Sequence, residues 1–357
     1  MFPHVKEFEK TVFDVFDPKP GEHVGIVYDT PGKDCVDSKV WRDRRQLAEE
    51  WTVFFQTLGS HIGFDVKLYS LKATGAHNKM VPSGVFNSLK RFNVIIALTE
   101  FSITSSLVQL VGRFPDEIRC ASLPGAERRM HSSVYISDYS MVNVFAHSLE
   151  SLIDKARSAR ILFSTSDEVV IDLRNRKAGA DDGDCTKPGS VINFPSGEGF
   201  SAPYEGVGIE KNQFGESKTV GVIPFVDQGD LVFGSVKHNR FVSFDGSAEA
   251  VSRVESYFNK PSSRRNIAEF GIGCNPNAMV TGNRFEDEKA GVHIAYGMSS
   301  HLGGKVSSDV HVDLVFAKNC PVEATMVTLF FPDDSSIDIV TDSRLQYEVL
   351  KNYSSSN

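Results

Sequence analysis

Two ionisable residues, His311 and Asp313, stand two positions apart in the apolar stretch VHVDLVF (310–316). In an extended strand, side chains two positions apart lie on the same face, so both would face one side while Val312 and Leu314 face the other. An imidazole beside a carboxylate on a rigid strand is a natural pair of ligands for a divalent metal ion. A hydrogen-bonded His–Asp pair at a strand end has the same pattern, so the pair alone leaves both interpretations open.

Further carboxylates and one more imidazole stand beside glycine-rich or strand-end turns upstream of this pair. They are Glu198 in NFPSGEGFSAP (193–203), Glu269 in IAEFGIGCNPNA (267–278), and Glu288 and His293 in RFEDEKAGVHIAYG (284–297). Glycines on both sides of Glu198 allow backbone angles that would let its carboxylate project into a site. A carboxylate that enters a buried strand, as Glu269 does, carries a desolvation cost unless it is paired or bound to a metal.

Each of these residues also has a simpler explanation. Glu269 would be solvated at a strand end, the acids around Glu288 would form a solvated helix start, and His293 would be a hydrogen-bonded core residue. Taken together, however, four carboxylates and two imidazoles are a ligand set for two divalent ions that share a bridging carboxylate. Two such ions, about 3.5–4 Å apart, can activate a water and polarise a carbonyl. Because no cysteine is needed, the set suits Zn²⁺, Co²⁺ or Mn²⁺.

Length and charge limit the class of protein. A chain of 357 residues predicts two domains. The net charge of −8, from 38 basic and 46 acidic residues, argues against nucleic acid or an anionic membrane surface as a partner. No apolar run of about 18 residues predicts a membrane helix, and the start MFPHVKEFEK is unlike a signal peptide. We therefore expect a cytoplasmic protein whose five widely spaced cysteines are reduced.

The first part of the chain alternates strand and helix patterns, which predicts an α/β domain with a doubly wound parallel sheet over residues 1–158. The strands are HVGIVYD (23–29), DVKLYSL (65–71) and FNVIIALT (92–99). A helix is expected over 39–59, ending at Gly59, with two more over SSLVQLVGRF (105–114) and SMVNVFAHSLESLIDKAR (140–157). The chain has no GxGxxG or Walker A sequence, so a nucleotide-binding role is not expected.

Residues 159–357 read as a mainly β domain, barrel-like with a few helices, that carries the metal site. Strand patterns dominate, and only AEAVSRVESYFN (248–259) is clearly helical. The glycine-rich, acidic stretch RKAGADDGDCTKPGS (176–190) is either a rim of the active site or a plain mobile loop.

The stretches NFPSGEGFSAP, AEFGIGCNP, DEKAGVHIAYG and VHVDLVF resemble, in order and approximate spacing, the motifs of the aminopeptidase T/aminopeptidase S family of metallo-aminopeptidases. The resemblance implies an α/β domain, a β-rich catalytic domain, a homodimer, and two divalent ions that cleave the N-terminal bond of small peptides. The metal ligands that it implies are Glu198, Glu269, Glu288, His293, His311 and Asp313. It also implies that Glu269 acts as general base on the bridging water and then as acid toward the leaving nitrogen.

One catalytic position departs from that family. Its tyrosine, seven residues after the histidine of the third motif, is Ser300 here, which leaves Tyr296 and His301 nearby as substitutes. The stretches YFNKPSSRRNIAEFGIGCNP and GGKVSSDVHVDLVFAKNC also resemble a dihydroxypyridine ring-cleaving dioxygenase of the same fold. That resemblance implies one Fe(II) held by two histidines and one carboxylate, with a histidine where this chain has Glu269.

Three functions follow from these patterns. The presence of Glu198, Glu269 and His293 favours the hydrolase, which would cleave an N-terminal peptide bond or a related amide. The alternative is a single-Fe(II) dioxygenase, or a related pathway enzyme, acting on a small molecule. The third is a binding protein that has kept the fold and lost catalysis.

Overall fold

The computed structural model describes residues 3–32 and 35–356. It divides into two compact units. The first comprises Met1–Asn143 and Gly183–Ser196, and the second comprises Val144–Asp182 and Gly197–Asn357. The chain enters the second unit within α5 (Tyr139–Lys155). The boundary expected after residue 158 falls inside that unit.

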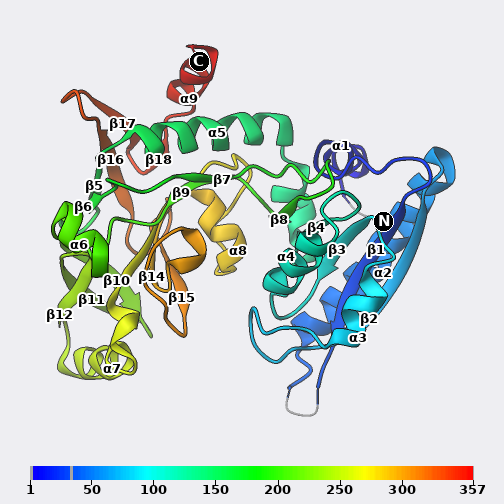
Figure 1. Ribbon diagram of the computed structural model, residues 1–357, viewed down its shortest axis with the longest axis horizontal. Coiled ribbons are helices and arrows are strands. Elements are labelled where there is room, and N and C mark those ends of the chain that lie inside the picture. The colour runs from blue at the N-terminus through cyan, green and yellow to red at the C-terminus, as the bar shows by residue number, and fades with distance from the viewer. Residues whose placement is uncertain (1–2, 33–34, 357) are drawn as a thin grey trace. The chain divides into compact units, whose positions relative to one another are not determined.

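The first unit is built on a five-stranded sheet in which every pairing is parallel, in the order β2-β1-β3-β4-β8 (Figure 1). Strand β3 is buried along its whole length, as a parallel strand covered on both faces should be. The strands are β1 (His23–Thr30), β2 (Asp65–Lys72), β3 (Val94–Leu98), β4 (Arg119–Ser122) and β8 (Val191–Asn193). This confirms the mixed α/β class and the parallel sheet, and adds β4 and β8, which the sequence did not predict.

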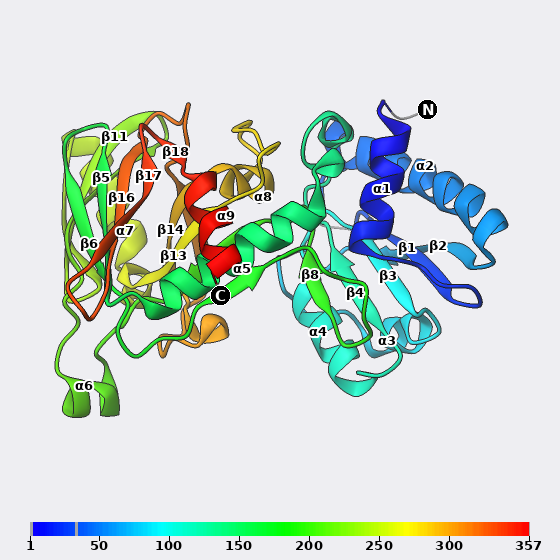
Figure 2. The same ribbon diagram turned by 90° about the horizontal axis from the view of Figure 1, so that it is seen from above.

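Helices cover both faces of the parallel sheet, with α1 and α2 on one side and α3 and α4 on the other (Figure 2). On the second side, Leu107 and Leu110 of α4 share one buried cluster with Ile95 of β3. The helices are α1 (Val5–Val15), α2 (Lys39–Ile62), α3 (Ser83–Leu89) and α4 (Thr104–Arg113). Burial on both faces explains why β3 reads as a continuous apolar run.

Helix α2 begins as predicted but does not end at Gly59. It continues to Ile62 and ends at Gly63, whose φ of 102° is the left-handed conformation that glycine adopts most easily. Gly59 is needed for a different reason, because a Cβ at this position would collide with the backbone oxygen of Phe64. The sequence signal at Gly59 was therefore one of close packing rather than of helix termination.

The second unit contains two antiparallel sheets. The larger has eight strands in the order β12-β11-β10-β6-β5-β16-β17-β18 (Figure 2). Its strands are β5 (Ser158–Phe163), β6 (Glu168–Asp172), β10 (Val220–Asp227), β11 (Asp230–Lys237), β12 (Arg240–Asp245), β16 (Ala324–Phe330), β17 (Ser336–Thr341) and β18 (Arg344–Leu345). The strand-rich prediction is confirmed, but among the described residues the strand pairing runs in open order from β12 to β18 and does not close a barrel.

The smaller antiparallel sheet has five strands in the order β15-β14-β13-β9-β7 (Figure 1). They are β7 (Gly179–Asp181), β9 (Glu198–Ser201), β13 (Ile267–Gly273), β14 (Val292–Gly297) and β15 (His311–Val315). Strands β13 and β14 are buried at every position. All four motifs singled out in the sequence contribute a strand to this sheet.

Four further helices belong wholly to the second unit. The predicted helix over 248–259 is confirmed as α7 (Ala248–Phe258). The others are α6 (Gly208–Phe214), α8 (Arg284–Asp287) and α9 (Tyr347–Ser356). Single 3₁₀ turns, η4 (Glu288–Ala290) and η5 (Ser300–Leu302), flank β14.

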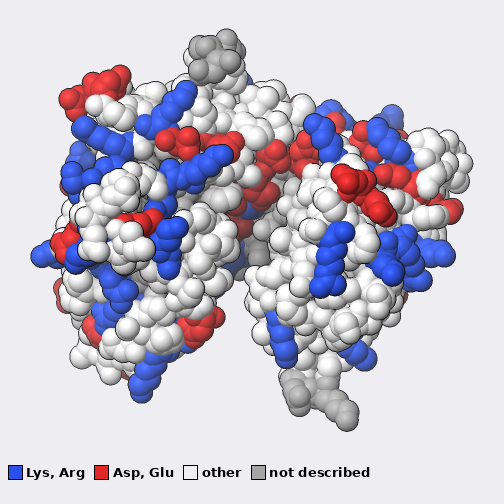
Figure 3. Space-filling model, in the orientation of Figure 1, with Lys and Arg blue, Asp and Glu red and all other residues white. Residues whose placement is uncertain are grey.

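Surface and membrane features agree with the composition. Within residues 3–32 and 35–356, no helix has the length and apolar character needed to span a membrane. On the face drawn in Figure 3, basic and acidic side chains are interspersed over each unit. All five cysteines are free thiols.

Candidate metal centre

Strand pairing places three of the predicted ligands on one face of the smaller antiparallel sheet. Ala295 of β14 pairs with Glu269 of β13 on one side and with Asp313 of β15 on the other, and Gly297 pairs with His311. Directly paired residues share a face of a sheet, so the three side chains converge above the small residues of β14. One ligand atom from each of Glu269, His311 and Asp313 lies within 4.8 Å of the others.

The imidazole of His311 is fixed in orientation. Its Nδ1 lies 2.7 Å from the carbonyl oxygen of Met298 and donates to it, so Nε2 faces the carboxylates. Nε2 is 2.9 Å from Oε2 of Glu269 and 3.7 Å from Oδ1 of Asp313. The side chains of His311 and Asp313 are 19% and 18% exposed, against 8% for Glu269, so the group opens toward solvent on the β15 side.

Glu269 also faces a second imidazole. Its Oε1 lies 3.8 Å from Nε2 of His293, which is 3.3 Å from Oε2 of Glu198. His293 reaches this position across Gly271, where any Cβ would collide with the imidazole ring. The two oxygens of Glu269 therefore lie between two histidines, one on β14 and one on β15.

A lysine that the sequence analysis did not select lies at the centre of the remaining acids. Nζ of Lys289 is 2.7 Å from Oε1 of Glu198, 3.0 Å from Oε1 of Glu288 and 3.0 Å from Oδ2 of Asp181. Its side chain is 1% exposed. The six predicted ligands therefore gather in one place, together with Lys289 and Asp181.

Local sequence explains why these side chains meet. Gly273 has no side chain, and a Cβ there would collide with the backbone of Glu288 and Lys289. The turn η4 therefore packs directly on β13, with Gly273 donating to the carbonyl of Gly291 at 2.8 Å. Close packing of this turn is what carries Glu288 and Lys289 inward.

The glycine before Glu198 serves a similar purpose. Gly197 has a φ of 124°, and its N–H donates to the carbonyl of Asp181 at 2.9 Å. Its own carbonyl accepts from Cys274 at 2.8 Å. This turn starts β9 so that Glu198 lies beside Asp181 of β7, the strand formed by part of the acidic stretch 176–190.

Burial and mutual charge shift the pKa values of the cluster. Burial lowers the pKa of His293, but the nearby carboxylates of Glu269, Glu198 and Asp313 outweigh this and raise the pKa to about 10. Burial also lowers the pKa of His311, but the carboxylates of Glu269 and Asp313 outweigh it and raise the pKa to about 9. Burial lowers the pKa of Lys289, yet Glu198, Glu288 and Asp181 raise it well above its ordinary value. Without a bound ion, the cluster therefore holds its protons on the nitrogens.

Burial raises the pKa values of three carboxyls, those of Glu198, Glu288 and Asp313. Glu269 differs from them. Burial would raise its pKa too, but the imidazoles of His293 and His311 beside it bring the pKa below its usual range. Glu269 is thus the acid that its neighbours hold most firmly in the charged form, which is the form that binds a metal.

The two residues considered as substitutes for the family tyrosine are placed very differently. Tyr296 follows His293 by three positions on β14, and an odd separation along a strand places two side chains on opposite faces. The hydroxyl of Tyr296 lies 3.4 Å from that of Tyr257 on that other face. The structure does not bring it to the cluster. The ring of His301, in η5 directly after Ser300, lies 4.7 Å from that of His311, edge to face.

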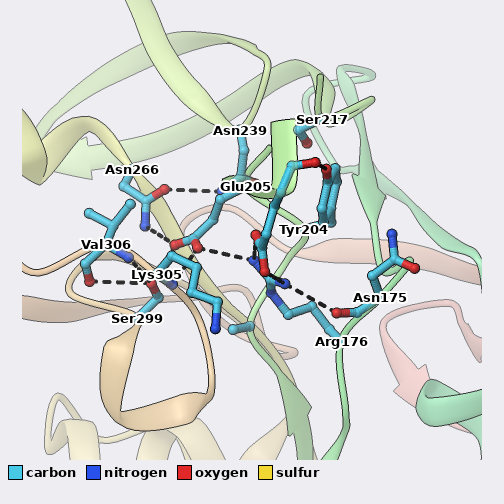
Figure 4. Close-up of polar contacts among 12 residues, drawn as sticks. Asn175, Arg176, Tyr204, Glu205, Ser217, Asn239, Asn266, Ser299, Lys305 and Val306 are labelled. Atoms are coloured by element: carbon cyan, nitrogen blue, oxygen red, sulfur yellow. Dashed lines mark hydrogen bonds and ion pairs between the residues drawn. The ribbon is translucent and has the colours of Figure 1, made fainter. Parts of the chain in front are cut away.

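The segment between β14 and β15, residues 298–310, is held by one buried carboxylate, Glu205 (Figure 4). Oε1 of Glu205 accepts from the hydroxyl of Ser299 and from Nδ2 of Asn266 at 3.1 Å. Oε2 accepts from the backbone N–H of Lys305 and lies 3.2 Å from Nη2 of Arg176. This segment carries both His301 and the Met298 carbonyl that orients His311.

Comparison with known proteins adds a likeness of fold. The chain is similar to the solved structure of 2,5-dihydroxypyridine dioxygenase from Pseudomonas putida KT2440, with a TM-score of 0.66. Sequence identity is 14%, and the match covers 96% of each chain. No family model and no curated protein sequence matches the chain.

These comparisons change the weight of the two resemblances seen in the sequence. The fold is shared with a dioxygenase over both units, as the second resemblance implied. Nothing in the comparisons supports assignment to the aminopeptidase T/S family. The favoured hydrolase interpretation is therefore less well supported than its oxygenase alternative.

The donor atoms present fit a divalent metal ion. One imidazole and two carboxylates converge in Glu269, His311 and Asp313, and such oxygen and nitrogen donors suit Fe²⁺, Mn²⁺ or Zn²⁺. In addition, Oε2 of Glu198 is buried without a hydrogen-bond partner among the described residues. Compared with an Fe(II) site of two histidines and one carboxylate, this ligand set differs at one position, where Glu269 stands in place of a histidine.

Proposed function

We propose that this protein is a metal-dependent enzyme whose divalent ion is bound by Glu269, His311 and Asp313. The observation that carries the proposal is the convergence of these three donors within 4.8 Å on one face of the sheet. The ring orientation of His311, fixed by the Met298 carbonyl, gives further support. Preorganised ligands of this kind are typical of functional metal sites rather than of surface ion pairs.

For the reaction, we propose oxygen-dependent cleavage of a small aromatic ring, in the manner of the dioxygenase whose fold the chain shares. The support is the likeness over 96% of each chain, combined with three protein donors that leave coordination positions open. Fe(II) held there would mediate the transfer of electrons from the aromatic substrate, which is the reductant, to dioxygen. A hydroxylated pyridine is the substrate class that this likeness suggests.

The chain itself would handle the proton of such a substrate. Burial and the neighbouring His311 lower the pKa of His301, so its imidazole is neutral near pH 7. A neutral imidazole beside the proposed ligand could accept a proton from an acidic ring hydroxyl as the substrate binds. Burial of Glu269 and His293 on the inner side would exclude water there.

A metal-dependent hydrolase is the second candidate, and Glu269 is the observation that favours it. A carboxylate occupies the position where an Fe(II) triad would carry a second histidine, and the set of one histidine and two carboxylates also suits Zn²⁺ or Mn²⁺. A water activated at such an ion could attack an amide, with Glu269 as general base.

The test begins with protein purified without added metal under nitrogen, whose iron, zinc, manganese and cobalt are then measured by elemental mass spectrometry. The protein is next loaded with Fe(II), and oxygen uptake is followed with 2,5-dihydroxypyridine and related hydroxylated pyridines. We expect uptake that requires both Fe(II) and an aromatic substrate. The Asp313→Asn variant should lose this oxygen uptake. The Glu210→Gln variant should retain it, because Glu210 pairs with Arg176 and not with Glu269, His311 or Asp313, the triad of proposed ligands.

Two results would contradict the oxygenase. Amide or peptide hydrolysis with Zn²⁺ or Mn²⁺ under nitrogen, without oxygen uptake, would support the hydrolase instead. Failure to retain any divalent ion would exclude both enzymes and favour a binding protein.

A further inference from the structure

The ammonium group of Lys289 lies among three carboxylates that do not belong to the triad. Its three carboxylate contacts are 2.7 to 3.0 Å long and come from three different parts of the chain, β7, β9 and η4. The shortest of them, to Glu198, is a charge-assisted hydrogen bond. A cation surrounded by three acids and 1% exposed is a built feature of the interior rather than a surface ion pair.

The acids that Lys289 binds are the ones a second metal ion would need. Glu198 lies on the side of Glu269 that faces His293, and Glu288 contacts the same ammonium group as Glu198. Lys289 takes Oε1 of each of them. An ion placed among the same oxygens would stand against a fixed positive charge at contact distance, which is strongly unfavourable in a buried site.

The lysine cannot easily leave this position. The backbone of its turn is packed against Gly273, and its carbonyl accepts from Asn275 at 3.1 Å. A move outward would leave three carboxylates, whose side chains are only 10–14% exposed, without a counter-ion, and such uncompensated charge is costly.

We propose that the Lys289 ammonium permanently fills the position of a second cation, so that the centre takes a single metal ion, at Glu269, His311 and Asp313. This inference rests on the proposed function, because it assumes that the triad binds metal. Its consequence is that the lysine, rather than a lack of ligands, sets the number of metal ions. Removing the lysine should therefore create a second site from Glu198, Glu288 and His293.

The experiment counts ions without reference to activity. Wild type, Lys289→Ala and Lys289→Met are equilibrated with excess Mn²⁺, desalted and analysed for manganese per folded chain. Mn²⁺ electron paramagnetic resonance then shows whether two bound ions are magnetically coupled. Lys318→Ala removes an exposed lysine of the same unit and serves as the control. Lys289→Ala combined with Glu198→Gln tests whether the extra ion depends on Glu198.

We expect one ion in wild type and in Lys318→Ala, two coupled ions in Lys289→Ala or Lys289→Met, and one ion again in the double variant. Two ions in wild type would overturn the inference, and so would one ion in a folded Lys289 variant. If neither single variant folds, the wild-type count and the double variant, which has lost one acid along with the lysine, decide. No ion in wild type would instead contradict the proposed function, which separates the two failures.

Discussion

The hydroxyl of Ser299 donates a hydrogen bond to Oε1 of Glu205, which ties the start of the 298–310 segment to a carboxylate buried beneath it. The next residue toward the N-terminus, Met298, supplies the carbonyl that orients His311. A residue far from the metal ligands in sequence thus fixes the direction of one of them. Outer contacts of this kind are part of a metal site, because they hold the ligand ring in its binding orientation.

Glu205→Gln should therefore weaken metal binding without removing a ligand. The amide keeps the shape of the side chain but cannot accept at both ends, so the contacts to Ser299 and Lys305 compete for one oxygen. We expect affinity for Mn²⁺ to fall about 10–100-fold, as is usual when an outer partner of a ligand is lost. Titration calorimetry checks this. Glu210→Gln, which contacts Arg176 but not the segment, should bind as wild type does. Equal losses in both variants would show that the network acts only on general stability.

Glu269→Gln and Glu288→Gln form a matched pair that tests which acids bind the metal. Both residues are glutamates of the same cluster, with side chains 8% and 14% exposed, but only Glu269 belongs to the triad. Glu269→Gln should lose the ion on desalting because a neutral amide is a poor ligand for a hard cation. Glu288→Gln should keep it, since its partner is Lys289. Metal content per chain decides, and a loss of metal in Glu288→Gln would extend the ligand set to that residue.

Gly271→Ala should disturb His293 while leaving the triad able to bind metal. A methyl group there collides with the imidazole of His293, and both positions are buried. Overpacking of this kind costs about 1–3 kcal/mol, measurable as a lower midpoint in urea. Gly112→Ala is the control, because nothing lies within 4 Å of its added methyl in α4, and replacing a helical glycine should stabilise by about 0.5–1 kcal/mol. An unchanged midpoint in Gly271→Ala would mean that His293 can move away freely.

Local sequence patterns predicted those parts of the fold and the site that depend on residues close together along the chain. Strand periodicity placed His311 and Asp313 on one face correctly, and buried apolar runs gave the parallel sheet of the first unit. Gathering of three of the four motifs follows from β13, β14 and β15 being consecutive antiparallel strands, whereas β9, which carries the fourth, pairs with β13 although β10, β11 and β12 lie between them in sequence. The ligand role of all six residues and the homodimer remain predictions.

Lys289 and Asp181 could not be found in the same way. A lysine that follows three acids reads as part of a solvated turn, and nothing in its neighbours says that the turn is buried. Its burial comes from the packing of η4 on Gly273, which is a tertiary contact. Asp181 lies in a stretch that resembles a mobile loop but pairs as β7 with β9. Both residues were missed because their environment is set by partners distant in sequence.

The stability of the ion-free protein should fall at alkaline pH, because His311 and His293 then lose their protons. In the folded chain without an ion, the pKa of His311 is about 9 and that of His293 about 10, both above the unfolded value of about 6.5. Their contribution to stability is therefore complete below about pH 6.5 and is lost as pH rises through 9 and 10. Unfolding of the ion-free protein in urea should therefore become easier as pH rises from about 6.5 to about 10.

Metal affinity, in contrast, should increase as pH rises, because the ion must displace the proton of its histidine ligand. If His311 alone is a ligand, each ion releases one proton near pH 8, and affinity rises about tenfold per pH unit until the pKa of His311 is reached. Titration calorimetry in two buffers of different ionisation enthalpy measures the number of protons. Two protons per ion would place His293 in the ligand set as well. One proton, with His293 still charged beside Glu198, would agree with a centre that already holds its second cation in Lys289.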